Sequence, residues 1–446
     1  MTTPTTPGVP DAPEHPEASL PKTTIPEVAM PEATEVPSAV AADLQDERLI
    51  QHSGVGGSIT AFRNRIRSGD LGSLPVIIGL VVIWVVFQLI NPTFLSSINL
   101  VNLTLQCAAI GTIAIGVVLV LLLGEIDLSV GSVSGLSSAI LAVGFVTLGW
   151  PLVVAIAASV LTGVVIGLLY GFLFTRFGVP SFVITLAGLL GFLGLQLWVL
   201  GETGSINIPF DSWIVQFAQQ WFLPDWLSYV IVVLAVLAYG AQLLVTSRAR
   251  NKAELSAKSV TSIIVRCVGL LILLGVPAWY LNQARGIGMM FLFFLVLVVV
   301  MNFFLTRTKW GRSVFAVGGN VEAARRAGIR VNRVYLSVFI LCSTFAAVGG
   351  ILAAARLAAA NQGSGGGDTN LNAIAAAVIG GASLFGGRGS AFSALLGILV
   401  IQSISSGLTL MNLDSSVRYM VTGAVLLLAV IVDSLSRRTR VSHGRA

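Results

Sequence analysis

Residues 117–132 read Val-Val-Leu-Val-Leu-Leu-Leu-Gly-Glu-Ile-Asp-Leu-Ser-Val-Gly-Ser, which places two carboxylates directly after an apolar run. Another apolar run, residues 140–146, follows, so Glu125 and Asp127 stand between two hydrophobic segments without a loop. An ionisable group in the bilayer costs roughly 2.5–3.5 kcal/mol on insertion scales and therefore needs a partner or a purpose. The neighbouring Gly, Ser and Asp residues favour a helix break that lines a cavity, followed by a new N-cap. Acids at the membrane surface that cap the next helix explain the pattern equally well.

The composition of the whole chain is that of a membrane protein. Hydrophobic residues make up 55% of the chain and charged residues 10%, and the mean hydropathy is +0.90. Soluble domains carry about 25% charged residues. We therefore predict an all-α polytopic membrane protein.

The first sixty residues have a different composition. Residues 1–50 hold nine of the sixteen prolines, nine carboxylates and two basic residues. Such a segment cannot bury a core, so we expect residues 1–60 to form a disordered, acidic cytoplasmic tail. It has no apolar run near Met1 and therefore no cleavable secretory signal. The remaining residues, 51–446, have 24 basic and 11 acidic side chains, which gives a net charge of +13.

Apolar segments follow the tail, and most reach the ~20 residues that a bilayer core requires. They are residues 74–90, 100–123, 128–147, 151–175, 179–200, 226–246, 262–281, 287–306, 334–357, 371–385, 391–411 and 417–435. We predict about twelve transmembrane segments, within a range of ten to twelve, in one domain over residues 61–436 with a basic tail at 437–446. The segment 371–385 is short and Gly-rich and could re-enter, and Arg266 and Pro277 interrupt 262–281.

The basic residues predict the orientation. In this arrangement 21 of the 24 basic residues after residue 50 share one face, and the other three are Arg285, Arg356 and Arg418. The positive-inside rule then gives cytoplasmic N- and C-termini in a multi-pass protein of the bacterial plasma membrane. An aromatic belt would occupy the opposite face, where the sequence places Trp150, Trp198, Trp213, Trp221, Trp226 and Trp279.

The apolar segments lack histidine and show no motif for binding a metal or a nucleotide. The three histidines lie in or near the tails, and the three cysteines are isolated without metal-ligand spacing. None of the four lysines stands in a P-loop. We therefore expect no metal, no cofactor and no enzymatic activity, so that any ATP-driven work is done by another chain.

The long loop at 307–333 predicts a short cytoplasmic helix. Asn320 is a suitable N-cap, and Glu322 falls in the first turn, where the helix dipole favours an acid. The helix would run from Val321 to Ala327 and stop at Gly328. A two-turn helix on a loop fits a groove on another protein, although an ordinary basic loop also explains these residues.

Three motifs resemble one family of transport proteins. Glu322-Ala-Ala-Arg-Arg-Ala-Gly328 resembles the E-A-A-x-x-x-G coupling loop of ATP-binding-cassette importer permeases. Residues 124–131 resemble the first signature of the ribose/xylose/arabinose permease branch, and residues 376–390 resemble its second. Glu125 stands where the branch often has Gly, a variant associated with xylose-type permeases. The resemblance covers residues 74–435, and the extra apolar residues around 226–281 also suggest the longer, xylose-type permeases.

The resemblance implies the permease subunit of a monosaccharide importer, for xylose or a related sugar, working as a dimer of permease chains in the lipid membrane. It also implies two cytoplasmic ATPase subunits and an extracytoplasmic sugar-binding protein, with no nucleic acid involved. Coupling to the ATPase would use Glu322, Ala323, Ala324 and Gly328. The candidate translocation-pathway residues are Glu125, Asp127, Ser129, Ser132, Ser134 and Asn370.

Two alternatives remain open from the residues alone. A proton-coupled secondary transporter would use Glu125 or Asp127 to carry the proton, and a non-transporting membrane scaffold would use the Pro-rich tail as its interaction module. The Gly/Ser-rich turns at 124–132 and 380–390 each separate two apolar segments on the same side. This pattern indicates an internal pseudo-repeat with two similarly oriented halves.

Overall fold

The computed structural model is predominantly helical, as the composition predicts. It describes residues 74–253, 255, 257–414, 416–417, 419–425, 427–428 and 431. Within these residues, nine helices are long and apolar enough to cross a membrane, and α2 (Leu74–Ile90) is apolar but shorter. The predicted tails at 1–60 and 437–446 lie outside the described residues, as does part of the predicted segment at 417–435.

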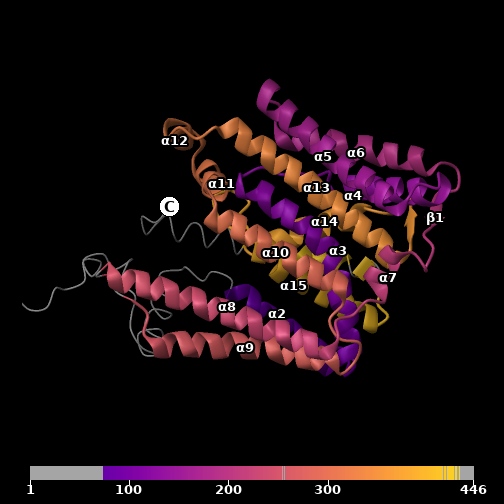
Figure 1. Ribbon diagram of the computed structural model, residues 1–446. Coiled ribbons are helices and arrows are strands. Elements are labelled where there is room, and N and C mark those ends of the chain that lie inside the picture. Colours follow the sequence, from indigo (N-terminus) through magenta and orange to yellow (C-terminus); the bar gives the residue numbers. More distant parts are fainter. Residues whose placement is uncertain are drawn as a thin grey trace, which may run out of the picture.

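The centre of the bundle is formed by α3 (Ser97–Leu122) and α13 (Val331–Leu357), which pack against each other. The most apolar stretch of α3 is 89% buried, so protein rather than lipid surrounds this helix. On its other sides, α13 packs against α4 (Val130–Ala142) and α5 (Leu152–Phe177) (Figure 1). Helices α3, α4, α5 and α13 therefore form the structural core of the chain.

Glycines allow α5 to approach α13 closely. A Cβ on Gly163 would stand 2.5 Å from the backbone oxygen of Ser343, and a Cβ on Gly167 would stand 2.5 Å from the Cα of Ile340. The two glycines are four residues apart and so lie on one face of α5. Small residues at this spacing bring the backbones of membrane helices together.

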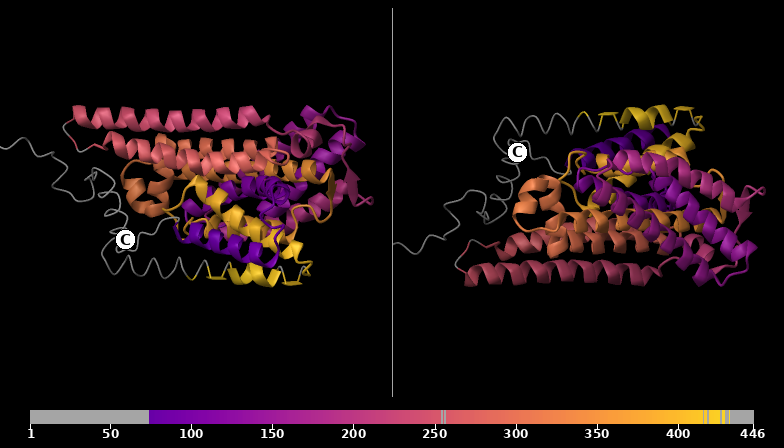
Figure 2. Two further views of the ribbon diagram at one scale, coloured as in Figure 1. Left: turned by 90° about the horizontal axis from the view of Figure 1, so that it is seen from below. Right: turned by 90° about the horizontal axis from the view of Figure 1, so that it is seen from above.

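The periphery is apolar and exposed. Helices α8 (Asp225–Lys252) and α9 (Val260–Asn282) form a hairpin at the edge of the bundle (Figure 2), and the most apolar stretch of each is only 11% buried. Such surfaces suit contact with lipid. Helix α9 continues through Pro277, so the predicted segment 262–281 is a single helix despite that residue.

Three further helices complete the packing around the core. Helices α10 (Met289–Arg307) and α15 (Ala391–Leu410) both contact α3, and α6 (Ser181–Leu200) packs against α4. The residues between α3 and α4 therefore have α5, α6 and α13 as neighbours.

At two positions in the bundle, the chain forms an irregular segment that is followed by a short helix. Residues 123–129 are not helical, and the chain then continues through α4 and a π-helical turn at Val143–Thr147. Residues 362–366 likewise precede α14 (Gly367–Ile379). The bounds predicted for the helix at 371–385 are wrong. The helix has 13 residues and ends at Ile379, and Gly381 then takes a φ of +100°, which favours glycine and interrupts the helix.

The bundle has two distinct ends (Figure 1). The first, here called the α12 end, carries α11 (Lys309–Gly319) and α12 (Val321–Arg326). The opposite end, here called the β1 end, carries α7 (Trp213–Gln219) and a two-stranded antiparallel sheet in which β1 (Ser205–Asn207) pairs with β2 (Ala359–Asn361).

Candidate functional site

Asp127 is buried inside the bundle rather than placed at the membrane surface. Its side chain is 1% exposed. Its Oδ1 accepts hydrogen bonds from the Ser129 backbone N–H (2.8 Å) and from the Ser129 hydroxyl (2.7 Å). The Cys342 thiol of α13 lies 3.6 Å from Oδ2 and donates to it. The carboxylate is thus held by hydrogen-bond donors.

The prediction that Asp127 caps the next helix is wrong in one respect. The N-cap of α4 is Ser129, and the Ser129 side chain makes no capping bond. Its hydroxyl hydrogen is directed to Asp127 instead. Asp127 therefore closes a local turn two residues before the N-cap, because its short side chain reaches the backbone N–H two positions later.

Side chains from three helices form hydrogen bonds with the irregular segment before α4, and two of them bond to its backbone. The Tyr170 hydroxyl of α5 donates to Ser129 Oγ (2.7 Å), and the Leu128 N–H donates to Thr185 Oγ1 of α6 (3.1 Å). The Asn370 side chain of α14 donates to the Leu128 carbonyl (2.7 Å). Non-helical backbone within a membrane domain requires such partners.

Sequence reasoning missed Tyr170 and Thr185. Tyr170 is the only tyrosine among residues 152–177, so a single phenol in an apolar run was the available signal. That signal does not identify the partner, because Tyr170 and Ser129 are 41 residues apart.

Glu125 has a more open environment than Asp127. It is half-buried, and its Oε2 accepts a hydrogen bond from the Ser181 hydroxyl at the start of α6 (2.6 Å). In the described part of the chain the ion pair present is between Glu322 and Arg325, so neither Glu125 nor Asp127 is paired with a cation there.

The predicted pathway residues on α4 and α14 point into packed protein. Ser132 and Ser134 are buried, and their hydroxyls donate to the carbonyls of Ser129 and Gly131, three residues earlier. Asn370 uses its Nδ2 for the Leu128 carbonyl, while its buried Oδ1 has no hydrogen-bond partner. These side chains stabilise the helix break in this conformation, and their contact with a substrate stays a prediction.

The two predicted signature turns meet each other. The Gly387 N–H donates to the Leu122 carbonyl (2.8 Å), and a Cβ on Gly124 would stand 3.5 Å from the Phe385 carbonyl oxygen. Gly318, near the end of α11, also lies here, since a Cβ on it would stand 2.9 Å from the Gly387 nitrogen. We call this contact of residues 122–124, 318–319 and 385–387 the glycine junction. The prediction that both turns share one side is confirmed.

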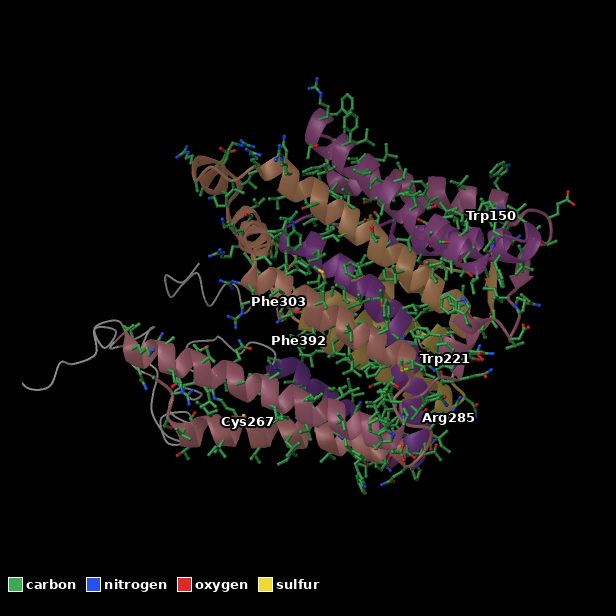
Figure 3. The ribbon with its side chains drawn as sticks, in the orientation of Figure 1. Trp150, Trp221, Cys267, Arg285, Phe303 and Phe392 are labelled. Carbon is green, nitrogen blue, oxygen red and sulfur yellow. The ribbon has the colours of Figure 1, made fainter. Side chains whose placement is uncertain are left out.

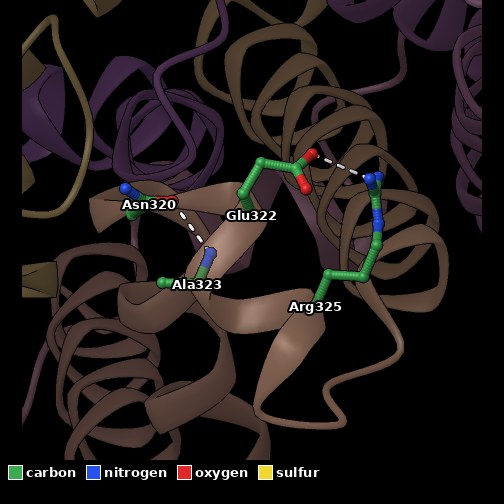
Figure 4. A network of polar contacts seen from close by, with 4 residues as sticks. All are labelled: Asn320, Glu322, Ala323 and Arg325. Carbon is green, nitrogen blue, oxygen red and sulfur yellow. Dashed lines mark hydrogen bonds and ion pairs between the residues drawn. The ribbon is translucent and has the colours of Figure 1, made fainter. Parts of the chain in front are cut away.

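The short helix α12 follows the glycine junction directly. Asn320 is its N-cap, and the Asn320 Oδ1 accepts a hydrogen bond from the Ala323 N–H (2.9 Å) (Figure 4). Glu322 lies in the first turn and forms an exposed ion pair with Arg325 (2.8 Å). Gly328 follows the helix with a φ of +79°. The predicted helix, its N-cap and its glycine stop are confirmed, and the helix ends one residue earlier than predicted.

The four predicted coupling residues have different environments. Glu322, Ala323 and Gly328 are exposed, whereas Ala324 is buried at 4% exposure and joins the apolar core. One side of α12 is therefore anchored to the bundle, and the other side faces outward.

Comparison with known proteins identifies the class of protein. A family model described as "Branched-chain amino acid transport system / permease component" matches residues 99–430, and the chain belongs to this family. The family match supports the predicted permease over the secondary-transporter and scaffold alternatives. The chain is thus a multi-pass membrane permease component and not an enzyme.

Sugar permeases are among its relatives. The xylose transport system permease protein XylH of Escherichia coli (strain K12) is 37% identical over 346 residues, which are 77% of this chain and 87% of that protein. The Haemophilus influenzae XylH is 33% identical over 375 residues, 84% of this chain and 99% of that protein. The ribose import permease protein RbsC of Bacillus subtilis (strain 168) is 30% identical over 365 residues, 82% of this chain and 94% of that protein. No solved structure matches the chain.

Proposed function

We propose that this chain is the translocation subunit of an ATP-binding-cassette importer for xylose or a related monosaccharide. The observation that carries the proposal is the position of α12, a capped helix with an exposed face, one residue beyond the glycine junction. The similarity to XylH proteins from two organisms favours a xylose-type substrate. The transmembrane domain would comprise residues 61–436, with ten to twelve crossings.

This geometry supports a coupling mechanism. Glu322 and Ala323 would contact a groove on the ATPase, while Ala324 holds α12 against the bundle. Because Gly318 and Gly319 end α11 against both signature turns, a displacement of α12 would reach residues 122–124 and 385–387. ATP-driven movement there would open and close a path between the helices by alternating access.

The six candidate pathway residues would have three different roles under this proposal. Asp127, Ser129 and Asn370 hold the irregular segment 123–129, and Ser132 and Ser134 stabilise the start of α4. Glu125, half-buried beside Ser181, is the least buried of the six and the one that a sugar leaving toward the α12 end could contact.

The partners occupy opposite ends of the bundle. Two ATPase subunits would bind the α12 end on the cytoplasmic side, where the positive-inside rule would also place both chain termini. A sugar-binding protein would dock at the β1 end, toward which Trp150 and Trp221 lie (Figure 3), as tryptophans of an outer interfacial belt would. A second copy of the chain would complete the pathway, and lipid would surround the exposed faces of α8 and α9.

Uptake in membrane vesicles tests the proposal. The chain is co-expressed with its ATPase, and sugar uptake is measured with ATP present while an uncoupler collapses the proton gradient. We expect uptake to continue and to stop when ATP is withheld. Uptake that follows the proton gradient and ignores ATP would contradict the proposal.

A further inference from the structure

A polar cavity of about 400 Å³ opens at the β1 end, far along the bundle from the glycine junction. Its lining contains five amide side chains, two guanidinium groups, two hydroxyl groups and two leucines, contributed by α3, α7, the loop before α10, and the ends of α13 and α15. Arg285 marks this region in Figure 3. The volume lies within the ~300–1,000 Å³ of small-molecule sites.

Helix α3 supplies one wall of amides. Asn99, Asn102 and Gln106 line the cavity at positions i, i+3 and i+7, which share one face of a helix. Asn99 is fixed, because its Nδ2 donates to the Phe94 carbonyl (2.7 Å) and its Oδ1 accepts from the Ser406 hydroxyl (3.1 Å). Asn102 is exposed and Gln106 half-buried, and neither side chain makes a hydrogen bond within the described residues. Their donors and acceptors are free for a ligand.

Another wall is held in place by Arg285 and Gln219. The Arg285 guanidinium donates to the Gln219 carbonyl (2.7 Å) and lies 4.3 Å above the centre of the Phe222 ring. The Gln219 side chain donates to the Arg356 carbonyl (2.9 Å), which ties α7 to the end of α13. Neither arginine forms an ion pair in the described part of the chain, and no carboxylate lines the cavity.

We infer that this cavity is a weak monosaccharide site, at which a neutral sugar first contacts the permease. The inference rests on the proposed function and adds the place and the residues of substrate entry. A sugar hydroxyl both donates and accepts, and so does an amide, while a guanidinium supplies several donors in a fixed plane. The two arginines disfavour a cation, and the amide walls disfavour an apolar ligand. The cavity is open at the surface, which suits a site that must release its sugar.

Cysteine labelling with sugar protection tests the inference directly. Asn102→Cys is introduced in a Cys267→Ser background, since Cys107 and Cys342 are buried. The full-length chain, assembled with its ATPase in nanodiscs, is treated with a polar maleimide in the presence of D-xylose, D-ribose or L-arabinose. A site with a Kd of about 1 mM slows labelling about 11-fold at about 10 mM sugar. Glu202→Cys, exposed near β1 and outside the cavity, is the matched control and should not be slowed.

A second variant separates a sugar site from an unspecific effect. Gln106→Leu, combined with Asn102→Cys, should leave labelling without sugar unchanged and should reduce the protection several-fold. The inference is overturned if no sugar protects up to about 100 mM, if Glu202→Cys is protected equally, or if the cavity cysteine never reacts. Protection by D-xylonate but by none of the neutral sugars would also overturn it, by assigning an anion site.

The proposed function is tested separately in the same preparation. If sugar uptake requires ATP but the cavity cysteine is not protected, only the entry site is wrong. If the ATPase does not associate or uptake ignores ATP, the proposed function itself fails.

Discussion

The single residues around Asp127 show how a buried carboxylate is kept without a cation. Its Oδ1 satisfies the N–H and the hydroxyl of Ser129, and the Ser129 oxygen in turn accepts from Tyr170. Asn in place of Asp keeps an acceptor oxygen at the same position. We therefore expect neutralising the charge to reduce uptake and stability less than shortening the side chain does.

We predict that Asp127→Asn retains most of the ATP-driven sugar uptake, whereas Asp127→Ala loses it and lowers stability. Alanine leaves the buried Ser129 N–H without a partner, which costs about 1–3 kcal/mol. The measurements are uptake in vesicles and the Tm of the purified chain. Glu125→Gly is the matched control, because Glu125 is half-buried and has one hydroxyl partner. Loss of uptake in Asp127→Asn with an unchanged Tm would contradict this and would indicate a proton-carrying role.

For single residues, the sequence predicted where the helix breaks but not which side chains contact the break. The break after Leu122 was predictable from Gly124 and the two acids in an apolar run. The hydrogen bonds were not, because Tyr170, Thr185 and Asn370 reach the break from positions far along the chain. Only packing of the helices decides which hydroxyl or amide meets which backbone group.

Among the elements, α12 was predictable because its signals are local. Asn320, Glu322 and Gly328 act on neighbouring residues through a cap, a dipole and a positive φ. Helix α14 was predicted with wrong bounds, because its start after residues 362–366 depends on the contact of Gly365 with α4. Long-range packing of this kind leaves no periodicity in the sequence.

For α12 we predict that Glu322→Lys and Gly328→Pro uncouple ATP hydrolysis from sugar uptake while the membrane core stays folded. The first substitution reverses a charge at the helix N-terminus, worth about 0.3–1 kcal/mol locally. The second cannot adopt the φ of +79° and removes the N–H that donates to the Arg325 carbonyl (3.0 Å). ATP turnover stimulated by loaded binding protein is measured beside uptake, with Lys309→Gln as control. Unchanged stimulation in both variants would rule out the coupling role.

The close contact of α5 and α13 gives a prediction about packing. Gly167→Ala should destabilise the chain by about 1–3 kcal/mol, because the new Cβ would stand 2.5 Å from the Ile340 Cα. Gly191→Ala on α6 is the matched control, since nothing lies within 4 Å of its Cβ position. Thermal unfolding in detergent compares the two, and equal Tm values would show that this contact adapts without strain.

For the whole molecule, composition was sufficient to predict a helical membrane protein, while the arrangement of the helices was not. Nothing in an apolar run distinguishes α3, which protein encloses, from α8, which is largely exposed. The polar cavity at the β1 end could likewise not be predicted from the sequence, because its lining comes from five segments spread between Asn99 and Leu410. The only indication of the cavity in the sequence was the group of amide side chains on the apolar helix α3.

The N-terminal tail gives a prediction for the whole molecule. Deletion of residues 1–50 should leave membrane insertion and sugar uptake close to those of the full chain, because a segment with nine prolines and nine carboxylates offers little that can pack against the bundle. The basic residues Arg63, Arg65 and Arg67 are retained and keep the positive charge that orients the first crossing. Insertion is measured by protease accessibility and uptake in vesicles. A severe loss of uptake with normal insertion would assign a functional role to the tail.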